Sequence, residues 1–179
     1  MITETTPAII AENIPEELTQ RPQWVCWRYE ERDGKLTKVP YQPNGRRASC
    51  SDLMTWSTFE ECFAKFLASQ KILAVEKDRG IHFEATGKPV FDGIGFVFCN
   101  ADPYAGIDLD KCRDPETGEI EPWAQKILGQ VPEGYIEVSP SGRGLHIFTE
   151  GAVRGGGMRK GRVEMYSQGR YFTVTGRLP

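Results

Sequence analysis

Tyr104-Ala-Gly-Ile-Asp-Leu-Asp-Lys111 is an apolar, strand-like run that contains two aspartates separated by one leucine. Side chains two positions apart on a strand leave the same face, so Asp108 and Asp110 are expected to lie side by side. Paired carboxylates on a stiff backbone suit Mg²⁺ or Mn²⁺. Two such ions, about 3.5–4 Å apart, can stabilise both the attacking and the leaving oxygen of a phosphoryl transfer. The alternative is a pair of exposed strand acids or a turn at the strand end, because a bare D-x-D is common.

Short strands are predicted on both sides of this run. Residues 93–98 form a compact apolar segment, and the turn at 100–103 is expected to place it antiparallel beside the aspartate strand. Upstream, segments 24–29 and 35–39 flank Asp33-Gly34, a strong hairpin signal, and Pro40 is expected to end that pairing. Downstream, four more strands are predicted at 135–138, 144–148, 162–166 and 171–174.

The main helix is predicted behind Ser57 and Glu60, which form a capping box. Apolar residues recur there at helical spacing and are expected to face the core: Phe59, Cys62, Phe63, Phe66 and Leu67. Shorter helical segments are predicted at 15–18 and 122–128, and a loop at 77–89. Many short strands with few helices indicate an α+β fold on a largely antiparallel or mixed sheet.

Length and composition place the chain among globular proteins with one core. It has 179 residues, of which 39% are hydrophobic and 26% charged, and a net charge of −3. No apolar run is long enough to span a bilayer and no signal-peptide core is present, so a cytoplasmic location and no membrane partner are expected. The five cysteines lack a C-x-x-C pair, which argues against a zinc knuckle and a disulfide framework.

A Ser/Gly turn that runs into a histidine strand, at 139–148, is the second chemical element. Its glycines allow close approach of a ligand, and consecutive amides in such a turn can bind an anion. His146 lies between two core-facing residues, so its imidazole is expected on the other face, where it could contact a phosphate or protonate a pyrophosphate leaving group. The alternative is an ordinary turn with a structural histidine. The candidate nucleotide-binding residues here are Ser139, Ser141, Gly142, Arg143, Gly144 and His146.

The third element contains Glu164, a lone acid between Val163 and Met165 that is expected to point away from their apolar face. A third carboxylate would complete a two-metal site. Arg170 lies beyond a glycine turn and could hold a triphosphate by bidentate contacts. The alternative is a plain hairpin with an outward Glu-Arg pair.

Basic residues are concentrated in the last part of the chain, where 154–162 is predicted to be a flexible loop. Such a loop could close over phosphates or follow a nucleic-acid backbone. The weaker candidates for nucleic-acid contact are Arg46, Arg47, Arg154, Arg159 and Lys160, and Lys38 is a weaker candidate for nucleotide contact. The alternative for all of them is a solvated basic surface.

Taken in this order, the three elements resemble the archaeo-eukaryotic primase superfamily, and more closely the primase-polymerase domains of phage and plasmid replication proteins. The family's h-D-h-D strand corresponds to 107–110, and its Ser/Gly turn with a histidine strand corresponds to 139–148. Its third motif, an acid followed in this subgroup by gRyf..TG, corresponds to Glu164 and 169–176. Two tryptophans, the K-x-P-Y segment at 38–41 and Thr55-Trp56 also match, so the resemblance extends from 24 to 176.

The resemblance implies template-directed nucleotidyl transfer, as a DNA primase and DNA polymerase in phage or plasmid replication within a bacterial host. It implies that Asp108, Asp110 and Glu164 hold two Mg²⁺ or Mn²⁺ ions and that His146 binds the phosphates of the incoming nucleotide. The substrates would be dNTPs or NTPs, and the partners a single-stranded DNA template and its primer.

The resemblance also implies an RRM-like catalytic half at 91–179 and a smaller N-terminal α/β half at 1–90, with the active site between them. Both would belong to one catalytic domain, 1–179, of a longer replication protein that carries a helicase or a helical priming domain. Two departures stand out. Gly144 occupies a position where many members have serine, and the cysteine set of the family's zinc-binding insertion is absent.

Three other functions remain open from the sequence. A replication initiator could use the same fold to bind origin DNA without catalysis, although bare carboxylates repel phosphate. A D-x-D glycosyltransferase would use the acids to hold a metal on a nucleotide-sugar, but no nucleotide-binding β-α-β start is evident. The third is a metal-dependent nuclease.

Overall fold

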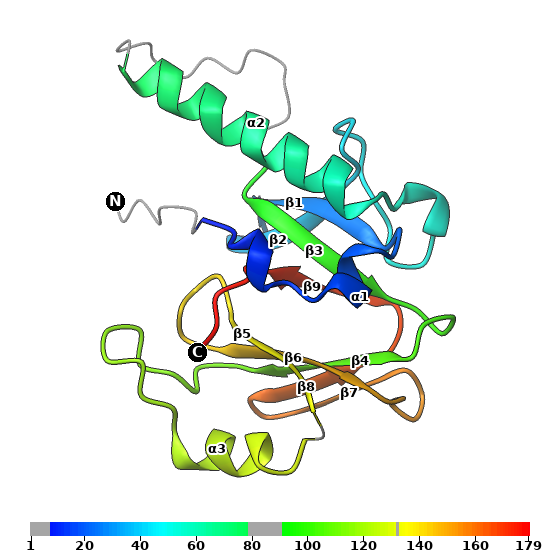
Figure 1. Cartoon of the computed structure of the whole chain (residues 1–179), viewed down its shortest axis with the longest axis vertical. Helices are drawn as coiled ribbons and strands as arrows, with labels where there is room; N and C mark the ends of the chain where they lie inside the picture. The colour runs from blue at the N-terminus through cyan, green and yellow to red at the C-terminus, as the bar shows by residue number, and fades with distance from the viewer. Residues whose placement is uncertain (1–7, 79–90, 132) are drawn as a thin grey trace.

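The computed structural model describes residues 8–78, 91–131 and 133–179, which form two antiparallel sheets and a few helices (Figure 1). The four-stranded sheet has the order β2-β1-β3-β9 and the five-stranded sheet the order β5-β6-β4-β8-β7. The predicted α+β class is therefore confirmed. The strands are β1 (Trp24–Arg32), β2 (Lys35–Tyr41), β3 (Gly93–Phe98), β4 (Tyr104–Leu109), β5 (Gly134–Val138), β6 (Leu145–Glu150), β7 (Gly157–Lys160), β8 (Val163–Tyr166) and β9 (Arg170–Val174).

The two longest helices, α2 and α3, lie at opposite ends of the molecule (Figure 1). The long helix α2 (Phe59–Asp78) packs on the four-stranded sheet through β1 and β3, while α3 (Pro122–Leu128) lies beyond the five-stranded sheet. Three short elements complete the described chain: η1 (Ala11–Asn13), α1 (Glu16–Thr19) and η2 (Leu53–Thr55). No helix among the described residues is long and apolar enough to cross a membrane.

Two hydrophobic cores hold these layers together. The larger core joins α2, the four-stranded sheet and the facing side of the five-stranded sheet, with Phe96, Phe98, Phe148 and Phe172 in edge-on and tilted contact. The smaller core lies between α3 and the opposite side of the five-stranded sheet. Gly106 on β4 is required by this packing, because a Cβ there would lie 2.5 Å from the ring of Phe98.

The predicted pairing of 93–98 with the aspartate strand is wrong. β3 pairs with β1 and β9, whereas β4 pairs with β6 and β8. The turn at 100–103 therefore carries the chain from one sheet to the other instead of closing a hairpin. Since β3 and β9 join β1 and β2, the four-stranded sheet draws on both sides of residue 90 and does not coincide with a 1–90 half. The boundary itself lies outside the described residues and stays a prediction.

Three local predictions need correction. Pro40 does not end the first hairpin, because it lies inside β2 opposite Trp27; β2 is an edge strand, where proline is tolerated. The cap of α2 is Thr58, whose hydroxyl accepts from the Glu61 amide, so the predicted Ser57 box is displaced by one residue. Part of the predicted loop at 154–162 is strand β7, paired with β8.

Two smaller differences concern α2. The predicted loop at 77–89 overlaps the end of α2, and residues 79–89 lie outside the described part of the chain. Within the apolar stripe of the helix, Cys62 and Phe66 are buried as expected, but Leu67 is exposed.

Candidate active site

Strand pairing brings three of the predicted site residues together. Asp108 on β4 is the register partner of His146 on β6 and of Glu164 on β8. Ile107 and Leu109 belong to the core beneath α3, so Asp108 and its two partners face the other way, toward the four-stranded sheet. The sequence prediction for the orientation of Glu164 and His146 is confirmed on this point.

Asp108 lies in an environment that disfavours its charge. Its side chain is 33% exposed, and burial is the main reason that the pKa of its carboxyl is raised. The nearby charges of Asp110 and Glu164 raise this pKa further, whereas His146 and Lys38 lower it. Asp110 and Glu164 therefore both lie close enough to Asp108 to repel its charge, and a bound cation would relieve that repulsion.

Asp110 follows the end of β4 and is exposed to solvent. Its backbone amide donates to the carbonyl of Arg162 at 2.9 Å, which joins the end of β4 to the turn between β7 and β8. This contact keeps Asp110 beside the strand that carries Glu164.

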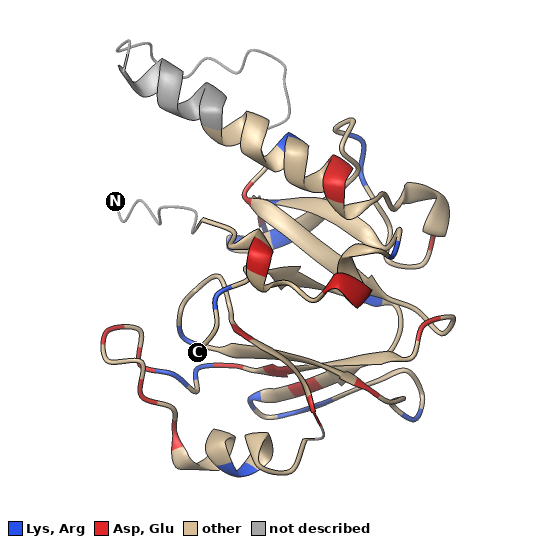
Figure 2. Cartoon of the chain, in the orientation of Figure 1, with Lys and Arg blue, Asp and Glu red and all other residues tan. Residues whose placement is uncertain are grey.

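Glu164 is partnered on both carboxylate oxygens. Arg159 Nε lies 3.1 Å from Oε1, and the Tyr166 hydroxyl donates to Oε2 at 2.8 Å. Arg159 and Glu164 are register partners on the adjacent strands β7 and β8, and Figure 2 shows basic and acidic segments together at this side of the five-stranded sheet. The expected metal ligand thus has an arginine next to it.

The donor chemistry fits a hard divalent cation, because it consists of carboxylate oxygens: Asp108 and Glu164 are partners on paired strands, and Asp110 follows the end of β4. In the arrangement described, however, no group of three or more acidic, histidine or cysteine side chains among residues 8–78, 91–131 and 133–179 is poised to hold a metal.

His146 is almost fully buried, and its ring is fixed from behind. Nδ1 lies 2.9 Å from the carbonyl oxygen of Thr173 and 3.3 Å from Glu137 Oε1, so Nδ1 carries a proton and donates. The other nitrogen, Nε2, is 4.0 Å from Asp108 Oδ1 and faces the acids. The ring therefore presents one nitrogen to the candidate site and anchors the other.

Glu137 is a residue of the site that the sequence interpretation missed. It is fully buried on β5, directly opposite His146. Its Oε2 accepts hydrogen bonds from the Tyr135 hydroxyl at 2.8 Å and from the amides of Thr175 and Gly176, both at 2.9 Å. The available signal was a single acid inside the apolar segment 135–138.

The Ser/Gly turn lies at the entrance to β6, against the end of β4. The Ser139 hydroxyl accepts from the Gly144 amide at 3.1 Å, and Gly142 has a left-handed φ of +73°. A Cβ at Gly144 would lie 2.8 Å from the Leu109 carbonyl oxygen, so glycine allows the turn to approach β4. Arg143 is exposed, and its carbonyl accepts from the Arg113 amide. Ser141 caps this turn by accepting from the Arg143 amide.

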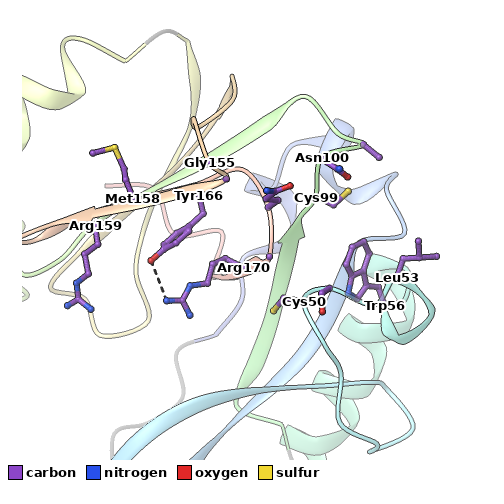
Figure 3. Close-up of a pocket in the computed structure, with 16 residues that line it drawn as sticks. Cys50, Leu53, Trp56, Cys99, Asn100, Gly155, Met158, Arg159, Tyr166 and Arg170 are labelled. Carbon is purple, nitrogen blue, oxygen red and sulfur yellow. Dashed lines mark hydrogen bonds between the residues drawn. The ribbon is translucent and has the colours of Figure 1, made fainter.

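A pocket of about 760 Å³ lies on the side of β7 and β9, next to the Arg159 and Tyr166 partners of Glu164 (Figure 3). Arg159, Tyr166 and Arg170 line one part of it, and Leu53 and Trp56 line another. Arg170 lies over the Tyr166 ring at 4.8 Å and donates to the Tyr166 hydroxyl at 3.3 Å. Arg170 is thus connected to Glu164 through a tyrosine.

The other predicted basic residues are distributed unevenly. Lys38 lies within electrostatic reach of Asp108, with its ammonium 5.6 Å from the centre of the Trp27 ring. Arg47 instead forms an ion pair with Glu30 at 2.8 Å on the four-stranded sheet. Arg46, Arg154 and Lys160 are exposed, and no contact in the described residues connects them with the acids. Their nucleic-acid contacts stay predictions.

No family model matches the chain. A curated relative, the DNA primase-polymerase of Nitratiruptor phage NrS-1, is 33% identical over 166 residues. The match covers 89% of this chain but 20% of the phage protein, so the chain spans about one fifth of that relative's length. The resemblance predicted from the three motifs is thereby confirmed: along nearly all of its length, the chain is similar to part of a phage DNA primase-polymerase.

Proposed function

We propose that this chain catalyses template-directed nucleotidyl transfer, as the primase-polymerase domain of a phage or plasmid replication protein. The observation that carries the proposal is the register that places Asp108 opposite both His146 and Glu164. Two carboxylates and an imidazole then share one face, in a chain that is 33% identical to part of a phage primase-polymerase.

In this proposal, Asp108, Asp110 and Glu164 hold two Mg²⁺ or Mn²⁺ ions. Such ions favour deprotonation of a primer 3′-hydroxyl and neutralise charge on the phosphates of the incoming nucleotide. Support comes from the raised pKa of Asp108, which burial and its acidic neighbours cause. A site that disfavours its own negative charge has a reason to take up a cation.

His146 would hold a phosphate group of the incoming nucleotide through Nε2, because Nδ1 is already bonded to Thr173 and Glu137. Arg170 and Lys38 would add positive charge from the four-stranded sheet, on the opposite wall. The Ser139 turn lies next to the end of β4, where its amides could contact the same phosphates.

The proposed substrates are dNTPs or NTPs, and the proposed partners are a single-stranded DNA template and its primer. Arg154, in the turn before β7, and Lys160, at the end of β7, would follow the template backbone. A helicase or helical priming domain elsewhere in a longer protein, and a location in the host cytoplasm, belong to the same proposal.

A primer-extension assay tests the function, with dNTPs and NTPs supplied separately and with Mg²⁺ or Mn²⁺. Asp108→Ala combined with Asp110→Ala should lower extension more than about 100-fold, because the main cation ligands are removed. The matched control is Glu116→Ala with Glu119→Ala, which removes two exposed acids from a surface turn.

Circular dichroism should show that both double variants stay folded. Retained extension by the folded aspartate variant would defeat the proposal. If the wild-type chain binds DNA but shows no metal-dependent nucleotide binding, an origin-binding initiator becomes the better description.

A further inference from the structure

In the metal-free protein, Glu164 already has a positively charged partner, the guanidinium of Arg159. Arg159 Nε lies 3.1 Å from Oε1, and the Tyr166 hydroxyl donates to Oε2 at 2.8 Å. Because both oxygens are engaged, an ion that binds Glu164 competes with these partners for the charge of the carboxylate. Arg159 is the partner that a cation would replace in charge.

Strand pairing builds the Arg159 contact. Arg159 on β7 is the register partner of Glu164 on β8, so the hairpin itself brings the guanidinium to the carboxylate. The arginine side chain is 69% exposed and that of Glu164 is 21% exposed. Arg159 can therefore leave the pair toward solvent without disturbing either core.

We propose that Arg159 is a positioning residue, the resident counter-ion of Glu164, which competes with a divalent cation for this carboxylate. The arginine neutralises the carboxylate in the metal-free protein and limits the affinity of the site for metal. This inference rests on the proposed role of Glu164 as a metal ligand. It assigns Arg159 a role distinct from simple contact with nucleic acid.

The pocket next to the partners of Glu164 can accommodate the Arg159 guanidinium once it leaves the carboxylate. Arg159 and Arg170 both line the pocket of about 760 Å³, and the described residues that line it include no aspartate or glutamate (Figure 3). A freed Arg159 would raise the positive charge of this pocket, which suits the phosphates of a nucleotide. Arrival of the metal then releases an anion-binding group, and the two binding events are linked.

Titration with Mn²⁺ alone, without nucleotide or DNA, tests the counter-ion role. The free Mn²⁺ signal in electron paramagnetic resonance reports binding directly and does not depend on activity. Arg159→Ala should bind Mn²⁺ about three- to tenfold more tightly than wild type, the range for a partly exposed ion pair. Arg159→Lys should fall between them, since an ammonium competes without the planar fork of arginine.

Lys160→Ala is the matched control. It removes the same charge from the next residue of β7, whose side chain leaves the opposite face and whose register partner is Val163. The Mn²⁺ affinity of Lys160→Ala should stay within about twofold of wild type, because the charges of Lys160 and Glu164 are not in contact. If Arg159→Ala and Lys160→Ala change the affinity equally, or if neither does, the counter-ion role is overturned.

Glu164→Gln separates this inference from the proposed function. Weaker Mn²⁺ binding by Glu164→Gln, together with tighter binding by Arg159→Ala, supports both. Weaker binding by Glu164→Gln with no effect of Arg159→Ala overturns the counter-ion role alone. Unchanged binding by Glu164→Gln overturns the counter-ion role together with the assignment of Glu164 as a metal ligand, and the primer-extension assay decides on nucleotidyl transfer separately. Thermal unfolding of each variant confirms that the hairpin change leaves the fold intact.

Discussion

Glu30 on the four-stranded sheet and Asp108 on the five-stranded sheet are both partly buried carboxylates, yet their surroundings differ. Glu30 accepts from the Tyr41 hydroxyl and pairs with Arg28, Arg32 and Arg47. The Tyr41 hydrogen bond, followed by those from Arg47 and Arg28, lowers the pKa of Glu30 from 4.5 to about 2. At Asp108, burial raises the pKa and two acidic neighbours raise it further.

This difference indicates which of the two carboxylates can still gain from binding a cation. The charge of Glu30 is neutralised by side chains of its own sheet, so an added cation would gain little there. Asp108 is left with a deficit of positive charge, which His146 and Lys38 offset only in part. Perturbed carboxyls of the second kind mark functional sites more often than those in satisfied ion pairs.

The largest expected effect comes from the scaffold that holds the two sheets together. Phe98 on β3 is fully buried, with its ring 5.1 Å from Phe172 and 5.6 Å from Phe148. Phe98→Ala should lower the free energy of unfolding by about 3–5 kcal/mol, because it opens a cavity between the sheets. Urea denaturation measures this. Leu36→Ala, at an exposed position on β2, should change it by less than about 0.5 kcal/mol. Equal stability of both variants would refute the scaffold role.

A smaller effect is expected at the support behind His146. Glu137→Gln keeps the shape but loses the charge that accepts from the Thr175 and Gly176 amides. We expect a loss of about 1–3 kcal/mol in the free energy of unfolding, since buried donors lose a strong acceptor. Primer extension should fall further than the folded fraction, because the His146 ring loses a fixed partner. Tyr135→Phe, which removes one donor to Glu137, is the control and should retain most activity.

The smallest effect concerns the pH dependence of the free energy of unfolding. It compares the two sheets directly, because Asp108 and Glu30 are expected to change this free energy in opposite directions. Asp108, with a raised pKa, destabilises the fold above that pKa and is relieved as the pH falls through it. Glu30, with a pKa lowered from 4.5 to about 2, stabilises the fold above 4.5 and loses this as the pH falls toward 2. Relative to wild type, Asp108→Asn should therefore gain stability at pH 7, while Glu30→Gln should lose it.

Urea denaturation at pH 7 and pH 3 checks this pair. At pH 3 both differences from wild type should shrink, since Asp108 is then protonated and Glu30 has lost part of its advantage. A Glu30→Gln variant that is more stable than wild type at pH 7 would contradict the assignment for the four-stranded sheet.

Much of the fold follows from local signals in the sequence. The Asp33-Gly34 turn predicts the β1–β2 hairpin, and alternation at 107–109 and 163–165 predicts which side chains face the smaller core. The partner of β3 could not be predicted this way, because it depends on β9, more than 70 residues later in the chain. The turn at 100–103 has the composition of a hairpin loop, yet it crosses between sheets.

The candidate site was predictable where its chemistry is concentrated in motifs. Asp108, His146 and Glu164 each stand out as a polar residue between apolar neighbours, and strand register brings them together. Glu137 has the same pattern but no motif, and its role depends on amides that arrive from the end of the chain. The pairing of Glu164 with Arg159 was hidden because 154–162 was expected to be a loop, and only a strand places Arg159 opposite the acid.

The few residues after β9 connect the two sheets through hydrogen bonds. The amides of Thr175 and Gly176 reach Glu137, the Arg177 carbonyl accepts from Val138, and its guanidinium donates to the Ser139 carbonyl at 2.6 Å. A fragment trimmed after Val174 would retain every strand but release the histidine support and the serine turn together. Any shortened version prepared for crystallisation or ligand screening should therefore extend at least through Arg177.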